Sequence, residues 1–342
     1  MTAILYLLYA MRTHLAIAIV LALAAGVVLA QEARISVDVS LVTLGVEVVD
    51  SNDRPVTTLK GDDFEIYEDG VRQQVRSFDS IETPYNILLL FDCSSSTEHD
   101  WPFLVEAMHR FTRTLRPQDR IEVAQFGSGF KVMQRWFART NDSVDIVLQT
   151  RDSVCSGTDF YGAIKKGIDE LQSVKGRRGI IVLSDGGHQQ IPYRNVRGDS
   201  PFAARYVDAA DDSDFQKVLK IASNSAAMLY FVAVDTDLNP DPEVGTSGRP
   251  GIFNPEDIYQ KQQLRSRIEQ LASVSGGRVV FPEDPEDVVM LYERMAQELG
   301  ASYSLGYALP EGSKRDGTHH KIEVRVRDRS LRLRQSRDEY IR

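Results

Sequence analysis

Cysteine is scarce in this 342-residue chain, which has just Cys93 and Cys155. Small exported proteins that depend on a disulfide framework carry several cysteine pairs, so that architecture is excluded. Two alternatives remain for the pair: one bridge between the two residues, or two small buried side chains. The sequence leaves both alternatives open.

Two further shortages exclude whole classes of function. The chain has no Gly-x-Ser-x-Gly elbow, no His-Glu-x-x-His, no Walker loop and no paired-cysteine zinc motif, so we expect no enzymatic activity. Positive charge is also low, because 40 Lys and Arg stand against 49 Asp and Glu, for a formal net charge of −9. This balance disfavours a polyanion, so we expect no nucleic-acid partner.

A long apolar run occurs near the amino terminus. Arg12 and His14 precede apolar residues from Leu15 to Ala30, and small residues end the run just before Gln31. This order is typical of a signal peptide over residues 1–30. At about 16 residues the run is short for a spanning helix, and a retained membrane anchor is the alternative. We therefore expect an exported protein, periplasmic or secreted to the cell surface, with no stable transmembrane helix after cleavage.

The most informative segment begins with a shorter apolar run. Residues 87–91 are all apolar and lead directly into Asp92, with Ser94 and Ser96 following at alternate positions. The run is typical of a parallel strand covered on both faces, and ligands of open α/β sheets bind beyond the carboxyl ends of such strands. Three oxygen donors at this spacing suit a hard cation such as Mg²⁺.

Two later segments have the same character. Thr158 lies in a glycine loop that runs into a helix. Asp185 follows a second apolar strand, Gly179 to Leu183, and is itself followed by glycine. Together the three segments bring five oxygen-bearing residues to the ends of strands or the starts of helices.

The set Asp92, Ser94, Ser96, Thr158 and Asp185, in this order and these contexts, resembles the metal-ion-dependent adhesion site of von Willebrand factor A domains. All five positions match. The resemblance implies that the serines and the threonine bind a divalent cation and that the aspartates act largely through water. The expected ion is Mg²⁺, with Mn²⁺ or Ca²⁺ as alternatives.

Such a site is suited to binding and breaks no bond. A cation surrounded mostly by neutral hydroxyls keeps part of its charge uncompensated, so an acidic side chain of a partner can complete its coordination. The resemblance therefore implies a protein or peptide partner that offers Asp or Glu. Two other interpretations remain: a structural or assembly module with an unused metal site, and a hydrolase that uses Cys93 or Ser94 with His99 or His188 as base.

The fold class follows from the alternation of strand and helix patterns over residues 84–300. We predict an α/β domain whose doubly wound, mainly parallel sheet has helices on both faces. The expected helices include 101–115, 143–150, 160–172, 215–225, 263–274 and 287–299.

The chain ends have a different pattern. Residues 31–83 and 301–342 alternate in hydrophobicity and are interrupted by turn residues, so we predict that they pack together as a small β unit. Residues 59–70 also resemble the lead-in of a bacterial group of exported proteins related to the A domain. The acidic residues of this segment fit no EF-hand spacing, and we interpret them as solvated.

Two long polar segments, residues 186–214 and 237–256, leave the carboxyl ends of predicted strands and should surround the metal site. The candidate contacts with a partner at this rim are His188, Asp159 and Arg197. Arg197 begins an Arg-Gly-Asp tripeptide, which we interpret as a chance occurrence because a given tripeptide arises in roughly several per cent of chains of this length.

Overall fold

The computed structural model describes residues 41–138, 153–195, 204–234, 236, 238, 255–282, 287–309 and 318–341. The chain divides between Val39 and Ser40, and all described elements belong to the second unit, Ser40–Arg342. The expected signal peptide and the expected helix over residues 143–150 lie outside the described residues. Within those residues, no helix combines the length and the apolar character that a membrane span requires.

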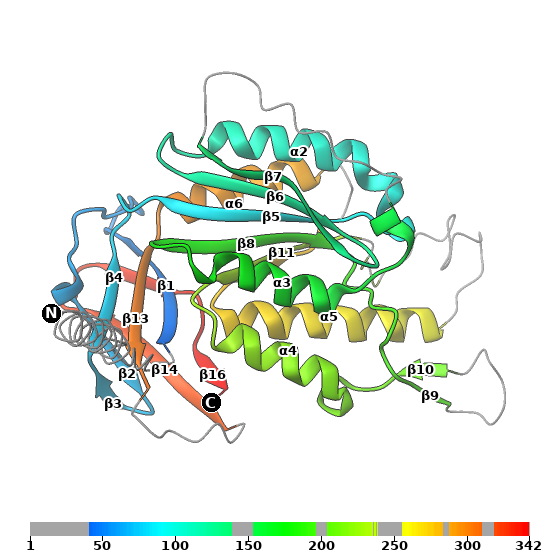
Figure 1. Ribbon diagram of the computed structural model, residues 1–342. Helices are drawn as coiled ribbons and strands as arrows, with labels where there is room; N and C mark the ends of the chain where they lie inside the picture. The colour runs from blue at the N-terminus through cyan, green and yellow to red at the C-terminus, as the bar shows by residue number, and fades with distance from the viewer. Residues whose placement is uncertain are drawn as a thin grey trace, which may run out of the picture. The chain divides into compact units, whose positions relative to one another are not determined.

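A six-stranded sheet forms the centre of this unit (Figure 1). In spatial order its strands are β12 (Arg278–Val280), β11 (Met228–Ala233), β8 (Arg177–Ser184), β5 (Tyr85–Asp92), β6 (Arg120–Phe126) and β7 (Phe130–Ala138). All neighbours are parallel except β7, which is antiparallel to β6. The predicted doubly wound, mainly parallel sheet is confirmed.

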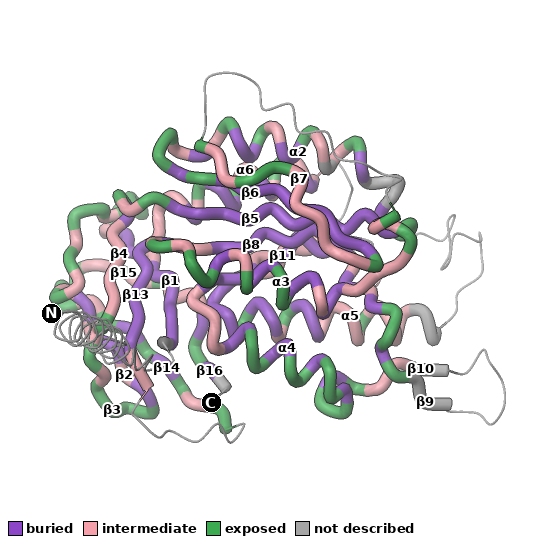
Figure 2. The backbone as a smooth tube through the Cα atoms, in the orientation of Figure 1, coloured by how far each residue is buried: buried purple, intermediate pink, exposed green. Residues whose placement is uncertain are grey.

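Helices cover both faces of this sheet, which explains the unbroken apolar run in β5. Leu88 and Leu90 belong to one core cluster, whereas Leu89 and Phe91 belong to the other. Every residue of β5 is buried, as Figure 2 shows along the strand. One face is covered by α2 (Trp101–Thr114) and α6 (Asp287–Gly300), and the other by α3 (Phe160–Gln172), α4 (Ser213–Ser223) and α5 (Pro255–Ser275).

The two ends of the described chain form two four-stranded antiparallel sheets. One has the order β15 (Arg332–Gln335), β1 (Leu41–Val49), β13 (Tyr303–Ala308), β4 (Val75–Asp79), and the other β16 (Glu339–Ile341), β14 (His319–Val326), β2 (Phe64–Glu68), β3 (Val71–Gln73). Buried side chains such as Leu44, Ile66, Leu305 and Val324 form their common core. The predicted β unit from both chain ends is confirmed. A further hairpin pairs β9 (Tyr193–Asn195) with β10 (Ala204–Tyr206).

Two buried arginines connect the β unit to the α/β part. Arg337 is 3% exposed and donates hydrogen bonds to the carbonyl of Thr43 at 2.7 Å and to that of Val274 at the end of α5. Burial lowers the pKa of Arg337 to about 10. Arg177, at the start of β8, donates to the carbonyl of Ile81 at 3.3 Å. Because these carbonyls are buried acceptors, loss of either arginine would leave polar groups without their donor.

Candidate metal centre at the carboxyl ends of the parallel strands

The sheet reverses its strand order between β5 and β8, the place where open α/β sheets form a crevice for ligands. The register pairs Phe91 of β5 with Leu183 of β8. The next residues, Asp92 and Ser184, therefore end neighbouring strands at the same edge, and Asp185 follows directly.

Asp92 is fully buried and is held by two hydrogen bonds. Its Oδ1 accepts from the backbone N–H of Ser94 at 2.9 Å, and its Oδ2 accepts from the Ser184 hydroxyl at 2.6 Å. Burial, and next the negative charge of Asp185, raise the pKa of Asp92 to about 7. Two carboxylates at this edge thus disfavour each other's ionised form, a situation that a bound cation relieves. Ser184 adjoins Asp185, but sequence reasoning assigned it no role.

The serine hydroxyls lie beside this carboxylate. Ser94 and Ser96 have their Oγ atoms 3.0 Å apart, with Ser94 buried and Ser96 exposed. Thr97, also fully buried, donates its hydroxyl to the carbonyls of Asp92 and Ser94 at 2.9 and 3.1 Å. This hydroxyl fixes the turn that presents the serines. No sequence signal other than the preceding serines points to Thr97.

A disulfide bond joins this turn to the loop before α3. Cys93 and Cys155 are bonded, with a Cα to Cα distance of 5.0 Å. This resolves the alternative that the sequence left open. The bond fastens the 3₁₀ turn Ser153–Ser156, and with it Thr158 three residues later in the chain, to the Asp92 loop. It also leaves Cys93 without a thiol.

Gly127, in the turn between β6 and β7, permits this close contact. A Cβ at Gly127 would lie 2.2 Å from the carbonyl oxygen of Val154 and 2.7 Å from that of Gly157, so no other residue fits without a shift of backbone. The Gly127 carbonyl also accepts from the N–H of Asp159 at 2.6 Å. The glycine therefore positions the Thr158 loop, although its sequence indicated just a hairpin turn.

Thr158 is fastened on its other side to the loop after β8. Its carbonyl accepts from the N–H of Gln189 at 3.0 Å. In that loop, Asp185 Oδ1 accepts from Gly187 N–H at 2.8 Å, and Gly186 adopts a positive φ of 76° where a Cβ would lie 2.7 Å from Ile268. The five residues predicted to bind metal thus lie on three loops that contact one another. Their role as ligands stays a prediction.

The three expected rim residues have different surroundings. Asp159 accepts a hydrogen bond from Gly162 N–H at 3.0 Å as the N-cap of α3, with half of its side chain exposed. His188 is 8% exposed and packs against the Tyr161 ring, with centroids 3.9 Å apart and ring planes tilted by 31°. Burial lowers the pKa of His188, which favours the neutral imidazole. A partner would therefore meet Asp159 before His188. Arg197 lies outside the described residues.

A buried polar network supports this part of the rim, and sequence reasoning missed it. The Tyr161 hydroxyl donates to Asp212 Oδ2 at 2.8 Å and accepts from Arg267 Nε at 3.1 Å. Arg267 is fully buried in α5, and its side chain also lies 3.5 Å from Asp212. A buried charge pair with hydrogen bonds on both partners holds the first turn of α3, and hence the Thr158 loop, in one position.

Comparison with known proteins finds one family match, over part of the chain. The sequence model of the von Willebrand factor type A domain matches residues 87–188, a range that contains all five predicted metal ligands. No curated protein matches the chain.

Among solved structures, the chain is similar to a von Willebrand factor type A protein from Catenulispora acidiphila (10% identity, 90% of this chain and 75% of that chain, TM-score 0.43). It is also similar to an aerotolerance-related membrane protein from Bacteroides fragilis NCTC 9343 (11%, 63% and 98%, TM-score 0.40). A third is proximal thread matrix protein 1 from the mussel byssus with a zinc-occupied MIDAS motif (13%, 69% and 50%, TM-score 0.42).

Proposed function

Since residues 87–188 match a von Willebrand factor type A domain, we propose that this chain is an exported, non-enzymatic binding protein. It holds a divalent cation and uses it to bind an acidic residue of a protein or peptide partner. The residues that hold the cation are Asp92, Ser94, Ser96, Thr158 and Asp185.

The observation that carries this proposal is the composition of the β5–β8 edge. A fully buried carboxylate, Asp92, is destabilised by Asp185, and next to it the Ser94 and Ser96 hydroxyls lie 3.0 Å apart. Two carboxylates and several hydroxyls are oxygen ligands of the kind that Mg²⁺ prefers, and Mg²⁺ commonly keeps positions for water or another ligand. When bound, the ion supplies an electrophilic centre that an outside carboxylate can reach.

Two features support the non-enzymatic part of the proposal. The sulfur of Cys93 is bonded to Cys155, so it is no nucleophile in this state. Ser94 faces the Ser96 hydroxyl, whereas His188 packs on Tyr161 and lies 3.7 Å from Asp159. A nucleophile needs a base within hydrogen-bond reach, and the contacts of His188 are with Tyr161 and Asp159. The side chain of His99, the other expected base, lies outside the described part of the chain.

The disulfide also supports export. Bridges persist in oxidising compartments and are rare where glutathione keeps thiols reduced. The bond between Cys93 and Cys155 therefore agrees with the amino-terminal signal expected from the sequence. Such an environment includes the periplasm and the cell surface.

Calorimetric titration of Mg²⁺ and Mn²⁺ into the metal-stripped chain from residue 31 onward tests the metal site. Ser96→Ala and Thr158→Ala should each weaken binding at least 10-fold, because each removes an oxygen ligand. Ser95→Ala is the matched control, since Ser95 is an exposed serine of the same turn that lies outside the predicted ligand set. Equal affinity in all three variants would refute the assignment of these hydroxyls.

Binding of an acidic partner is tested separately with immobilised peptides. A peptide pool that contains Asp or Glu should retain the protein in Mg²⁺ and release it in chelator, whereas the same peptides with Asn or Gln should not retain it. Retention that is indifferent to both the amide exchange and the chelator would contradict a cation-mediated mechanism while leaving the metal site itself intact.

A further inference from the structure

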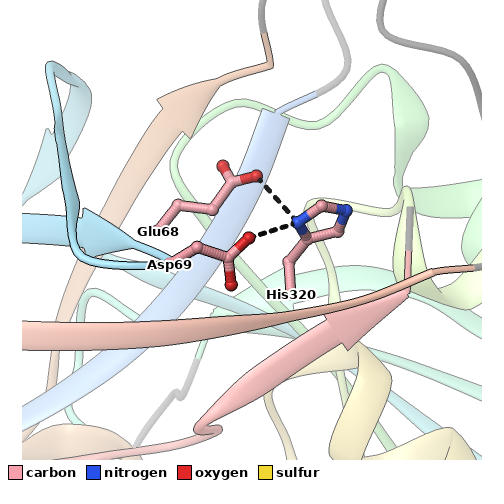
Figure 3. A group of neighbouring side chains, drawn as sticks. All are labelled: Glu68, Asp69 and His320. Carbon is pink, nitrogen blue, oxygen red and sulfur yellow. Dashed lines mark hydrogen bonds and ion pairs between the residues drawn. The ribbon is translucent and has the colours of Figure 1, made fainter.

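A second group of metal-ligating side chains lies in the β unit, far in sequence from the first. Glu68 ends β2, Asp69 follows in the turn to β3, and His320 lies on β14. His320 Nδ1 is 2.7 Å from Asp69 Oδ2 and 3.5 Å from Glu68 Oε1 (Figure 3). Glu68 is 4% exposed, in contrast to the solvated side chain expected from the sequence.

The backbone holds this group together without help from a ligand. β2 and β14 are antiparallel neighbours, with Glu68 opposite Ile322. The Asp69 N–H donates to the carbonyl of Lys321, and the Lys321 N–H donates to Asp69 Oδ1, both at 2.9 Å. Asp69 also adopts a positive φ of 50°, which the hairpin turn requires. The three side chains therefore converge through strand pairing.

The second ring nitrogen of His320, Nε2, also has a partner, and this contact bears on the state of Nδ1. His320 Nε2 lies 2.8 Å from the Thr318 hydroxyl. When Nε2 carries the hydrogen and donates it to Thr318, Nδ1 presents a lone pair toward two carboxylates. Three electron pairs facing one point repel each other unless a cation lies between them. That point holds either a proton on Nδ1, which Nδ1 then donates to Asp69 Oδ2, or a metal ion.

Tyr340 holds two of the three ligands in place. Its ring stacks on His320 with centroids 5.3 Å apart, and its hydroxyl donates to Glu68 Oε1 at 3.0 Å. Tyr340 is itself buried, 2% exposed. Hydrogen bonds to a carboxylate ligand, as from Tyr340, and to the second nitrogen of a histidine ligand, as with Thr318, are typical of protein metal sites.

We propose that Glu68, Asp69 and His320 form a second metal site, selective for Zn²⁺ or a similar transition ion. One imidazole nitrogen and two carboxylate oxygens are zinc ligands, and three of them leave a fourth tetrahedral position for water or another molecule. Ligand atoms around zinc lie about 3.3 Å apart. The Glu68 to His320 distance of 3.5 Å matches this spacing, and the Asp69 to His320 distance of 2.7 Å widens when the ion replaces the proton.

The ion would cross-link the hairpin of β2 and β3 to strand β14, which comes about 250 residues later in the chain. It enters from solvent past Asp69, whose side chain is 52% exposed, while Glu68 forms the buried base of the site. Its ligands are ionisable and include nitrogen, so it differs in metal preference from the hydroxyl-rich edge of the parallel sheet.

Zinc titration with a matched pair of histidine variants tests this proposal. The chain from residue 31 onward keeps the whole unit Ser40–Arg342. It is stripped of metal, saturated with Mg²⁺ and titrated with Zn²⁺ against a chromophoric chelator. His320→Ala should weaken binding at least 100-fold. His319→Ala, which removes a 61% exposed histidine from the same strand, should bind like the unmodified chain.

Zinc should also raise the melting temperature of the unmodified chain and of His319→Ala, but not that of His320→Ala. If His320→Ala fails to fold, Glu68→Gln takes its place in the experiment, because the glutamine side chain still offers a hydrogen-bond acceptor to Tyr340. In the unmodified chain, Zn²⁺ should shift the His320 imidazole resonances and stop their titration with pH. Equal zinc affinity in the two histidine variants, or His320 resonances that respond to protons but not to Zn²⁺, would overturn the proposal in favour of a proton-bridged cluster.

Discussion

The two polar clusters of this molecule are built in opposite ways. The edge after β5 and β8 gathers hydroxyls and a buried carboxylate on loops, and a disulfide fastens those loops together. The cluster in the β unit places two carboxylates and an imidazole on a hairpin and a paired strand, and no disulfide of the described residues lies there. In this molecule the disulfide braces loops that follow parallel strands, whereas antiparallel strand pairing holds the second cluster together.

The two clusters also differ in the chemistry of their candidate ligands. Neutral hydroxyls leave a hard cation electron-poor and receptive to a partner's carboxylate, as the first site requires. Two carboxylates and a histidine neutralise a divalent ion and hold it firmly, as a structural site requires. Under the two proposals, one fold provides for two ions that need not compete.

Removing the brace should have the largest effect on this comparison. The bridge between Cys93 and Cys155 spans 62 residues, and its loss through a double Cys→Ser substitution should lower the free energy of unfolding by about 4 kcal/mol. Mg²⁺ affinity should fall because the Thr158 loop separates from the Asp92 loop, while Zn²⁺ affinity at His320 stays the same. Denaturant unfolding and parallel metal titrations measure this, and an equal loss at both sites would show that the brace is not local.

Asp92→Asn should have the second largest effect, because it should weaken Mg²⁺ binding at the first site and leave Zn²⁺ binding at the second unchanged. The amide keeps the shape of the carboxylate but removes its charge, so Mg²⁺ binding should weaken about 100-fold, or about 2.7 kcal/mol. Zn²⁺ binding at the β-unit cluster should be unchanged. Glu68→Gln should give the reverse result. A single variant that weakens the binding of both metals equally would indicate that the two clusters are coupled.

The pH dependence of the metal-free protein should report on Asp92 as well. The folded pKa is raised to about 7, above the ordinary value of 3.8, so the folded state binds more protons than the unfolded chain between these values. For this group, stability should therefore be greatest below about pH 4 and fall as pH rises toward 7. Saturating Mg²⁺ should remove the loss because it favours the ionised carboxylate.

Asp92→Asn is the control for this pH profile. It lacks the titrating group, so its metal-free form should show a flatter dependence and a higher melting temperature than the unmodified chain at pH 8. Thermal melts at several pH values, with and without Mg²⁺, provide the measurement. An unchanged slope in the variant would assign the pH dependence to other carboxylates.

The first cluster was predictable because each of its residues carries a local signal. Asp92 ends one apolar strand and Asp185 directly follows another. Thr158 follows a glycine in a loop before a helix, so the pattern of a few neighbouring residues suffices. The doubly wound sheet followed from the same alternation. Gly127, Thr97 and Ser184, which position these residues, went unassigned because a turn glycine or a single hydroxyl is common in any loop.

The second cluster was not predictable in this way. Glu68 and Asp69 lie in an acidic turn like many solvated ones, and His320 is 251 residues beyond Asp69. The pairing of the two chain ends was predicted, but the register that places Glu68 opposite Ile322 was not. A shift by one residue would point His320 to the other face of its strand. The side-chain group depends on that register, which hydrophobic alternation alone does not determine.

Tyr340→Phe should give the smallest effect and the finest test of the second cluster. The substitution removes the hydrogen bond to Glu68 Oε1 but keeps the ring that stacks on His320. If the hydroxyl orients a zinc ligand, Zn²⁺ affinity should fall about 10-fold with Mg²⁺ affinity unchanged. If Glu68 is merely a buried carboxylate paired with a protonated histidine, the substitution should lower stability alone. Zinc titration and thermal melts distinguish a zinc ligand from a carboxylate paired with histidine. The stabilisation by zinc depends on the Tyr340 hydroxyl in the first case alone.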